Sequence, residues 1–225
     1  MAEITKALSM SNLRRKKFNP VTFDEPWNSF LGSRELKGVW TIYGPSGHGK
    51  TSMAIQLANY LCQFGKVMFD SLEQGASESL IDAFKREGLL EQDGKCTLEE
   101  FADLEVLREK LTVPSKKDPN IRLEKKHTPK IIVIDSLNTL PVNSYKYVKE
   151  LTDLLPNKLF ILIGWGKMDR GQVKPDGVIV KNAIFWADVK IKVEAFRAYA
   201  NARGHSKTTV YTINEEMAKI YEAQL

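Results

Sequence analysis

The sequence predicts an α/β fold, built on a doubly wound and mostly parallel β-sheet with antiparallel strands at its C-terminal end. Two continuous apolar runs, 130–135 and 158–164, are typical of strands that are buried on both faces of a parallel sheet. Helical patterns separate the apolar runs in the middle of the chain, whereas apolar and charged residues alternate over 189–194. A length of 225 residues suits one such domain.

Composition and charge indicate a globular protein that does not span a membrane. The chain is 43% hydrophobic and 27% charged, as in ordinary globular proteins, and its net charge of +5 is compatible with a polyanionic partner. Cys62 and Cys96 lack the spacing of a zinc site, and the first residues lack the order of a signal peptide. No run approaches the ~20 apolar residues of a membrane span. We therefore expect a cytoplasmic protein with reduced thiols and no membrane association.

Residues 1–20 are predicted to form a basic N-terminal arm that precedes a single domain over 21–225. The arm contains Arg14-Arg15-Lys16-Lys17 and few large apolar side chains. Such a charge cluster at a terminus is typical of a solvated tail. The alternative is an arm that contacts nucleic acid or another subunit.

A glycine-rich turn joins a strand predicted over 39–43 to a helix predicted over 50–64. The turn has the pattern G-x-x-x-x-G-K-[ST], in the strand-to-helix context that this phosphate-binding motif requires. Its glycines let backbone N–H groups converge on an anion, and the first helical turn adds its own free N–H groups. A nucleoside triphosphate is therefore expected to bind at Gly44, Pro45, Ser46, Gly47, His48, Gly49, Lys50, Thr51 and Ser52.

The other elements follow from apolar spacing and from residues that stop helices. The aromatic segment 23–31 is expected either to pack on the edge of the sheet or to flank the nucleotide base. A strand is predicted over 66–72 and helices over 77–87 and 144–155. Thr97-Leu98-Glu99-Glu100 has the form of a capping box, which predicts a helix that continues to Leu111. Prolines and charges over 114–129 predict an exposed connection, and 208–213 is expected to pair with 189–194.

Two acidic residues stand at the ends of predicted strands. Asp135 ends the apolar run 130–135, at the carboxyl end of a strand, where ligands bind in open α/β sheets. We expect Asp135 and the Thr51 hydroxyl to hold Mg²⁺; the alternative is an ordinary aspartate that caps a turn. Glu73 follows the strand over 66–72 and is the predicted general base for an attacking water molecule. Asp70 competes for this role, but strand alternation puts it on the other side.

Three segments together resemble the RecA-like ATPases, a superfamily that includes the recombinases, the KaiC and RadA proteins and the DnaB-type replicative helicases. The segments are 44–51, 69–73 and 132–137. In that superfamily a catalytic glutamate, often within Ser-Leu-Glu, ends the second strand, and this matches Glu73. A Mg²⁺-associated aspartate followed by serine matches Asp135 and Ser136. The resemblance covers roughly 23–221 and implies a single-domain RecA-like P-loop ATPase, with ATP and Mg²⁺ as cofactors, that forms a ring or filament as a homo-oligomer.

The resemblance implies two further features. One is a mobile DNA-contacting loop, here 166–177, whose cations Lys167, Arg170 and Lys174 could follow a phosphate backbone or simply be solvated. The other is a C-terminal cation that reaches the nucleotide of the neighbouring subunit. Asn201-Ala202-Arg203-Gly204 is similar to the Lys-Asn-Arg-x-Gly pattern of the helicase branch, which makes Arg203 the expected finger. Asn201 replaces the lysine, and Trp165 occupies the neighbourhood of an expected γ-phosphate sensor.

The sequence therefore predicts an ATP-hydrolysing, RecA-like protein with Lys50, Glu73 and Arg203 as catalytic residues. We expect it to act on single-stranded DNA as an oligomer, in recombination, as a replication accessory or in a helicase-like role. One alternative is a slow nucleotide-dependent switch without motor activity, which Asn201 and Trp165 favour. A small-molecule phosphotransferase is a weaker alternative, because the chain lacks an arginine-rich lid segment and Glu73 suits water activation.

Overall fold

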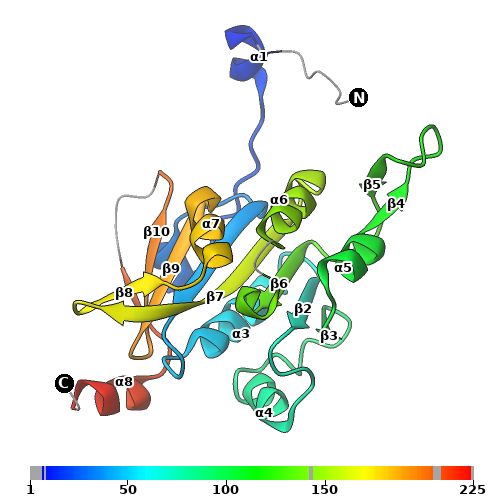
Figure 1. Ribbon diagram of the computed structural model, residues 1–225. Helices are drawn as coiled ribbons and strands as arrows, with labels where there is room; N and C mark the ends of the chain where they lie inside the picture. The colour runs from blue at the N-terminus through cyan, green and yellow to red at the C-terminus, as the bar shows by residue number, and fades with distance from the viewer. Residues whose placement is uncertain (1–6, 8, 142–143, 205–208, 224–225) are drawn as a thin grey trace.

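A nine-stranded β-sheet organises the computed structural model, which describes residues 7, 9–141, 144–204 and 209–223 (Figure 1). The strands are β1 (Gly38–Gly44), β2 (Val67–Ser71), β3 (Cys96–Glu100), β6 (Ile131–Asp135), β7 (Leu159–Asp169), β8 (Gln172–Pro175), β9 (Val189–Glu194), β10 (Arg197–Ala202) and β11 (Val210–Thr212). Their order is β11-β10-β9-β1-β7-β6-β2-β3, and β8 pairs with β7 outside this path. Neighbours from β9 to β3 run parallel, whereas β8, β10 and β11 are antiparallel to their partners. The predicted fold class, with antiparallel C-terminal strands, is confirmed.

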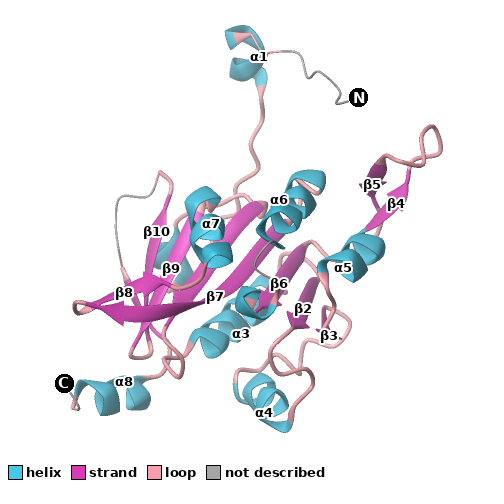
Figure 2. Ribbon diagram, viewed as in Figure 1, coloured by secondary structure: helices cyan, strands magenta, loops and turns pink. Residues whose placement is uncertain are grey.

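Helices cover both faces of the sheet (Figure 2). On one face pack α2 (Trp27–Leu31), α3 (Lys50–Leu61) and α4 (Glu78–Arg86), and on the other pack α5 (Leu104–Leu111), α6 (Tyr145–Leu154) and α7 (Val178–Trp186). Ile131 and Val133 of β6 join the first layer, and Ile132 and Ile134 join the second. Because both layers are apolar, β6 is buried on both faces, as its continuous apolar run predicts.

Three further helical segments complete the described part of the chain. The 3₁₀ turn η1 (Leu137–Thr139) follows β6, and α8 (Glu215–Glu222) lies near the C-terminus. The short helix α1 (Met10–Arg15) projects from the body on an extended segment (Figure 1). Residues 1–6 and 8 of the predicted arm lie outside the described residues. No helix in the described part of the chain has the length and apolar character needed to cross a membrane.

The aromatic segment around α2 packs on the core. Phe23, Trp27 and Phe30 are all buried, and Trp27 stacks on Tyr60 of α3 and on Tyr211 of β11. Side chains buried in this way have no free face for a base to stack on. Of the two predicted roles for this segment, packing against the sheet is the one that the structure supports.

The helix predicted to begin at the Thr97 capping box is wrong over its first part. Residues 96–100 form the edge strand β3, in which Thr97 and Leu98 pair with Met68 and Phe69 of β2. The helix α5 begins only at Leu104, and the Asp103 side chain caps it by accepting a hydrogen bond from the backbone N–H of Val106. The sequence signal was ambiguous because an edge strand that is half exposed carries as many polar residues as a helix start.

Two segments predicted as irregular are β-hairpins. Overlapping the segment 114–129, β4 (Thr112–Pro114) pairs with β5 (Arg122–Glu124) in a hairpin that projects from the body (Figure 1). The expected mobile loop over 166–177 consists of the end of β7 and the strand β8, joined by the turn Arg170–Gly171. The helix α7, which follows this hairpin, was not predicted at all.

Candidate active site

The glycine-rich turn connects β1 to α3 at the carboxyl edge of the sheet. Gly47 and Gly49 have φ angles of +78° and +98°, which side chains rarely allow. A Cβ atom on Gly49 would lie 2.9 Å from the ring of Phe196. Glycine is thus required at position 49 both by backbone conformation and by packing, and the loop has the left-handed turns that a phosphate nest requires.

Gly44, the first residue of the motif, lies between two neighbouring strands. A Cβ atom there would lie 2.1 Å from the carbonyl oxygen of Val193 in β9. On the other side, a Cβ atom on Gly166 of β7 would lie 2.9 Å from the Gly44 Cα. The sheet therefore closes tightly around the point where the chain leaves β1 and enters the loop.

Lys50 and Thr51 open α3 and face the end of β6. Thr51 Oγ1 donates a 2.9 Å hydrogen bond to Asp135 Oδ2, and Lys50 Nζ donates a 2.8 Å bond to the carbonyl oxygen of Pro45. Burial raises the pKa of Asp135 to about 6, with a further rise from the charge of Glu73, while the Thr51 bond and the Lys50 charge oppose the shift. Burial also lowers the pKa of Lys50, although the charges of Asp135 and Glu73 act against that change.

Glu73 lies beside this group because β2 and β6 end next to each other. The backbone N–H groups of Leu72 and Glu73 donate to the Asp135 carbonyl oxygen over 2.6 and 3.2 Å. Glu73 Oε2 accepts hydrogen bonds from Ser136 Oγ at 3.0 Å and from Trp165 Nε1 at 3.4 Å. The carboxylate is thus held at the strand edge, within the same group as Lys50 and Asp135.

Asp70 lies away from this group. It is fully buried in β2, where Oδ1 accepts a 3.2 Å hydrogen bond from the backbone N–H of Ala102 and Oδ2 has no hydrogen-bond partner among the described residues. Burial raises the pKa of this carboxyl to about 7. Its position agrees with the expectation that strand alternation separates Asp70 from Glu73.

Several residues at the site were not assigned a role by sequence reasoning. Trp165 was noted only as an unexpected residue, yet its indole N–H contacts Glu73, and its backbone N–H donates a 2.7 Å bond to Asn138 Oδ1. Asn138 in η1 carries no motif, so only its position three residues after Asp135 could have drawn attention to it. Of the residues predicted to bind the triphosphate, Ser46 is exposed, and Ser52 Oγ accepts a 3.3 Å hydrogen bond from Arg86 on α4.

Arg203 lies at the amino ends of the parallel strands, whereas the loop lies at their carboxyl ends. It follows the end of β10, where Ala202 pairs with Val189 at the start of β9. Its guanidinium lies 3.5 Å from Asp188 and donates a 3.3 Å bond to the carbonyl oxygen of Trp186. Since β1 and β9 run parallel and the loop follows the end of β1, Arg203 does not contact the nucleotide site of its own chain.

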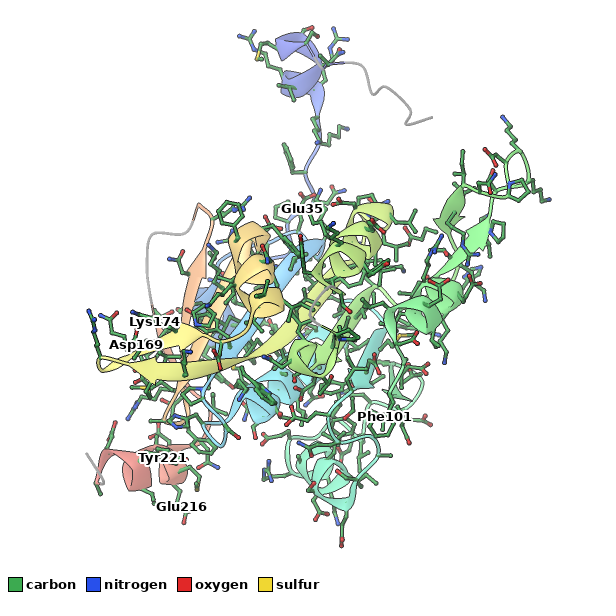
Figure 3. The ribbon with its side chains drawn as sticks, viewed as in Figure 1. Glu35, Phe101, Asp169, Lys174, Glu216 and Tyr221 are labelled. Carbon is green, nitrogen blue, oxygen red and sulfur yellow. The ribbon has the colours of Figure 1, made fainter. Side chains whose placement is uncertain are left out.

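The hairpin formed by β7 and β8 carries the three cations that were assigned to DNA. Two of them lie in ion pairs, Lys167 with Asp176 at 3.0 Å and Lys174 with Asp169 at 2.5 Å. Figure 3 shows Asp169 and Lys174 near the tip of this hairpin. Arg170, at the turn, has a left-handed φ of +51°. The segment predicted as a loop is therefore a β-hairpin in which two of the three predicted cations are paired with carboxylates.

The donor set fits Mg²⁺. The Thr51 hydroxyl and the Asp135 carboxylate are hard oxygen donors that already lie within hydrogen-bond distance of each other. Among the described residues, no three His, Cys, Asp or Glu side chains form a metal-binding group. Mg²⁺ commonly uses one or two protein oxygens and takes its other ligands from phosphates and water.

Comparison with known proteins shows the fold. No protein-family model matches the sequence, and no curated protein matches it. The chain is similar to a solved structure whose title describes it as an ATPase domain, with a TM-score of 0.52 and 13% sequence identity, covering 79% of this chain and 80% of that chain. At this identity the likeness concerns the fold alone, and it agrees with the predicted α/β fold class with a mostly parallel sheet.

Proposed function

We propose that this chain is a Mg²⁺-dependent ATPase whose active site is the group at the carboxyl edge of the sheet. One observation carries the proposal: Lys50, Thr51, Glu73 and Asp135 come from three separate segments and meet beside the glycine-rich loop. The loop supplies backbone N–H groups for phosphates, α3 supplies its N-terminal end, and Glu73 supplies a carboxylate. These are the parts that phosphoryl transfer to water requires.

Each residue has a distinct role in the proposed reaction. The Lys50 ammonium binds the β- and γ-phosphates, and its placement beside Asp135 and Glu73 keeps it charged despite its burial. Glu73 orients the attacking water molecule and accepts its proton. Thr51 and Asp135 would hold Mg²⁺, which neutralises charge on the phosphates when bound. Ser136 and Trp165 orient the Glu73 carboxylate through the hydrogen bonds they donate to it.

Two variants test the site. Lys50→Ala should abolish ATP binding in a fluorescence titration, because it removes the cation that neutralises the phosphates. Glu73→Gln should keep ATP binding within about threefold and lower turnover by about 10²–10⁴-fold, the usual contribution of a general base. Glu78→Gln on α4 is the matched control and should leave turnover unchanged. Equal turnover in Glu73→Gln and in the unaltered protein would refute the assignment of the base.

We further propose that the protein acts on single-stranded DNA through the β7–β8 hairpin. The hairpin projects from the body, and Arg170 at its turn is the cation best placed for a phosphate (Figure 1). Arg170→Asn is the appropriate variant, because asparagine tolerates the left-handed conformation. It should reduce DNA-stimulated ATPase activity by several-fold, whereas Lys117→Asn on the β4–β5 hairpin, with the same change in charge, should not. A turnover rate indifferent to DNA would refute this part.

An oligomer is proposed because Arg203 is remote from the nucleotide site of its own chain. Mixing Arg203→Ala with Lys50→Ala subunits should restore part of the ATPase activity, since a mixed interface joins an intact loop to an intact arginine. Mixing Lys50→Ala with Glu73→Gln is the control. Lys50 and Glu73 both belong to the nucleotide site of the same subunit. Neither kind of subunit in this mixture therefore has an intact loop together with an intact base. Absence of rescue in mixtures shown to co-assemble would refute a role for Arg203 in a neighbouring site.

A slow nucleotide-dependent switch is the second candidate. The Trp165 hydrogen bond to Glu73 favours it, because the indole N–H and the Ser136 hydroxyl both bond the one oxygen, Oε2, and so compete with an attacking water molecule for it. The ion pair of Arg203 with Asp188 favours it as well, since it holds this arginine on its own chain. Turnover that stays slow with every nucleic acid tested, together with tight ATP binding, would support the switch over the motor.

A further inference from the structure

The phosphate loop is attached to the turn between β9 and β10 by a set of contacts centred on His48. His48 Nδ1 accepts a 3.0 Å hydrogen bond from the backbone N–H of Ala195, and the His48 carbonyl oxygen accepts a 3.1 Å bond from the N–H of Phe196. Both N–H groups of the two-residue turn are therefore bound to one residue of the loop. We refer to these two hydrogen bonds as the loop–turn contact.

The turn has a strained backbone that needs such support. Ala195 and Phe196 have φ angles of +48° and +56°. A two-residue hairpin turn with both φ angles positive normally contains asparagine, aspartate or glycine, because a Cβ atom disfavours this conformation. Strained residues persist where surrounding contacts hold them, and here the contacts come from His48 and from the packing of Phe196 against Gly49.

Aromatic packing reinforces the contact from the C-terminal side. The Tyr221 hydroxyl of α8 donates a 3.2 Å hydrogen bond to the carbonyl oxygen of Gly47, and its ring packs edge-on against His48 at 4.9 Å and against Phe196 at 5.6 Å. Figure 3 places Tyr221 on α8, beside the lower edge of the sheet. Three consecutive loop residues, 47–49, thus contact the C-terminal hairpin or α8.

We propose that His48 is a positioning residue that holds the phosphate loop in its anion-binding shape by fastening it to the Ala195–Phe196 turn. The inference rests on the proposed function, since the loop it positions is the proposed ATP site. His48 performs this role in its neutral form with the proton on Nε2, because Nδ1 must carry a free lone pair to accept from Ala195. Nucleotide affinity therefore depends on a ring nitrogen whose partner is the backbone N–H of Ala195.

The charges around His48 favour its neutral form. Burial lowers the pKa of His48, and the Lys50 charge lowers it further, while Glu194 of β9 acts in the opposite sense. The ring also faces Tyr221 of α8, and Ala195 and Phe196 of the turn bring no charge. The contact is thus complete above the ordinary histidine pKa of 6.5 and weakens as the pH falls through the lowered pKa.

Two substitutions distinguish the effect of the His48 hydrogen bond from the effect of its aromatic ring. His48→Phe keeps an aromatic ring for Tyr221 and removes the acceptor, whereas His48→Asn removes the ring and places an amide oxygen close to the position of Nδ1. At about pH 7.5, His48→Phe should bind a fluorescent ATP analogue roughly fivefold to tenfold more weakly, which is the low end of the cost of an unpaired N–H, because Ala195 is only half-buried. His48→Asn should bind within about twofold of the unaltered protein.

The pH dependence supplies a readout that simple packing would not change. Between about pH 7.5 and pH 5.5, the affinity of the unaltered protein should fall more steeply than that of His48→Asn, whose acceptor does not titrate. His127→Asn, on a remote exposed segment, is the control and should retain the steeper fall. Equal pH profiles for the unaltered protein and His48→Asn would overturn the proposal, as would equal affinity in His48→Phe.

Amide exchange tests the contact without nucleotide. The N–H groups of Ala195 and Phe196 should exchange faster in His48→Phe and at the unaltered rate in His48→Asn, with thermal unfolding confirming that both variants fold. Unchanged exchange in His48→Phe would overturn the loop–turn contact. If the unaltered protein failed to bind ATP, the proposed function would fail, while amide exchange would still decide whether His48 holds the turn.

Discussion

Replacing Asp70 by asparagine should stabilise the protein at neutral and alkaline pH and should have little effect in acid. The carboxyl is fully buried in β2, and within the described part of the chain only one of its oxygens has a hydrogen-bond donor, the N–H of Ala102. Burial raises its pKa from 3.8 to about 7, and the charges of Glu99 and Asp103 add to the rise, while the Ala102 bond and Lys110 oppose it. Asparagine keeps the acceptor for Ala102 and has no charge to bury.

The magnitude follows from the pKa shift. A rise of about three pKa units corresponds to about 4 kcal/mol, since one unit is worth 1.36 kcal/mol. For an acid whose pKa is raised on folding, the folded state binds more protons, so the free energy of unfolding falls as the pH rises from 3.8 towards 7. Above that range the loss is complete, and the variant should be more stable than the unaltered protein by up to about 4 kcal/mol.

Urea denaturation of both proteins from about pH 4.5 to pH 8.5 measures this difference directly. Other titrating groups cancel in the comparison, because the two chains differ at one side chain only. The expected result is near-equal stability at the acid end and a growing advantage for Asp70→Asn towards the alkaline end. A difference that is constant with pH would refute the reasoning, because it would mean that Asp70 does not titrate in this range.

Two other variants follow from contacts described for the site and the fold. Trp165→Phe removes the N–H that orients the Glu73 carboxylate, so steady-state ATP turnover should fall about twofold to fivefold with ATP affinity unchanged; a rise in turnover would show that the bond restrains Glu73, as in the switch. Lys158→Met should lower the free energy of unfolding by about 2–3 kcal/mol in urea, because the buried ammonium bonds Thr128 Oγ1 and the Pro129 carbonyl oxygen and pairs with Glu124. An unchanged denaturation midpoint would contradict the second expectation.

The centre of the fold could be predicted because its signals are local and strong. The runs at 130–135 and 158–164 are continuous and apolar, and such runs have few uses other than strands covered on both faces. The edge of the sheet could not be predicted in the same way. Residues 96–100 are half exposed, and their status as a strand depends on pairing with β2, which is a contact distant in sequence.

Glycine was the residue most open to misreading. Over 166–177 the resemblance implied a mobile loop in a glycine-containing stretch, but Gly171 lies in a tight turn and Gly166 allows β7 to approach Gly44. Turn formation and close packing use the same residue as flexibility does, so composition alone cannot distinguish them. The helix α7 was missed because it follows directly on this segment.

The site could be predicted as far as its motifs reach. The positions of Lys50, Thr51, Glu73 and Asp135 at strand or helix ends come from local sequence, and the structure brings these residues together. The role of Trp165 and the contacts of His48 could not be predicted from the sequence, since each depends on a partner that is distant in the chain. His48 was predicted only as one of the phosphate-binding loop residues, and the residues that it contacts at 195 and 221 carry no motif.

The closure of the sheet around Gly44 bears on how this sequence could evolve. The carbonyl oxygen of Val193 leaves no space for a side chain at position 44, whether or not a ligand is ever bound. A descendant that had lost all catalysis would still be under selection to keep this glycine, whereas position 50 would be free to drift. In distant relatives with this fold, the first glycine of the motif therefore indicates only that the sheet is intact. The lysine is the better indication of a functional nucleotide site.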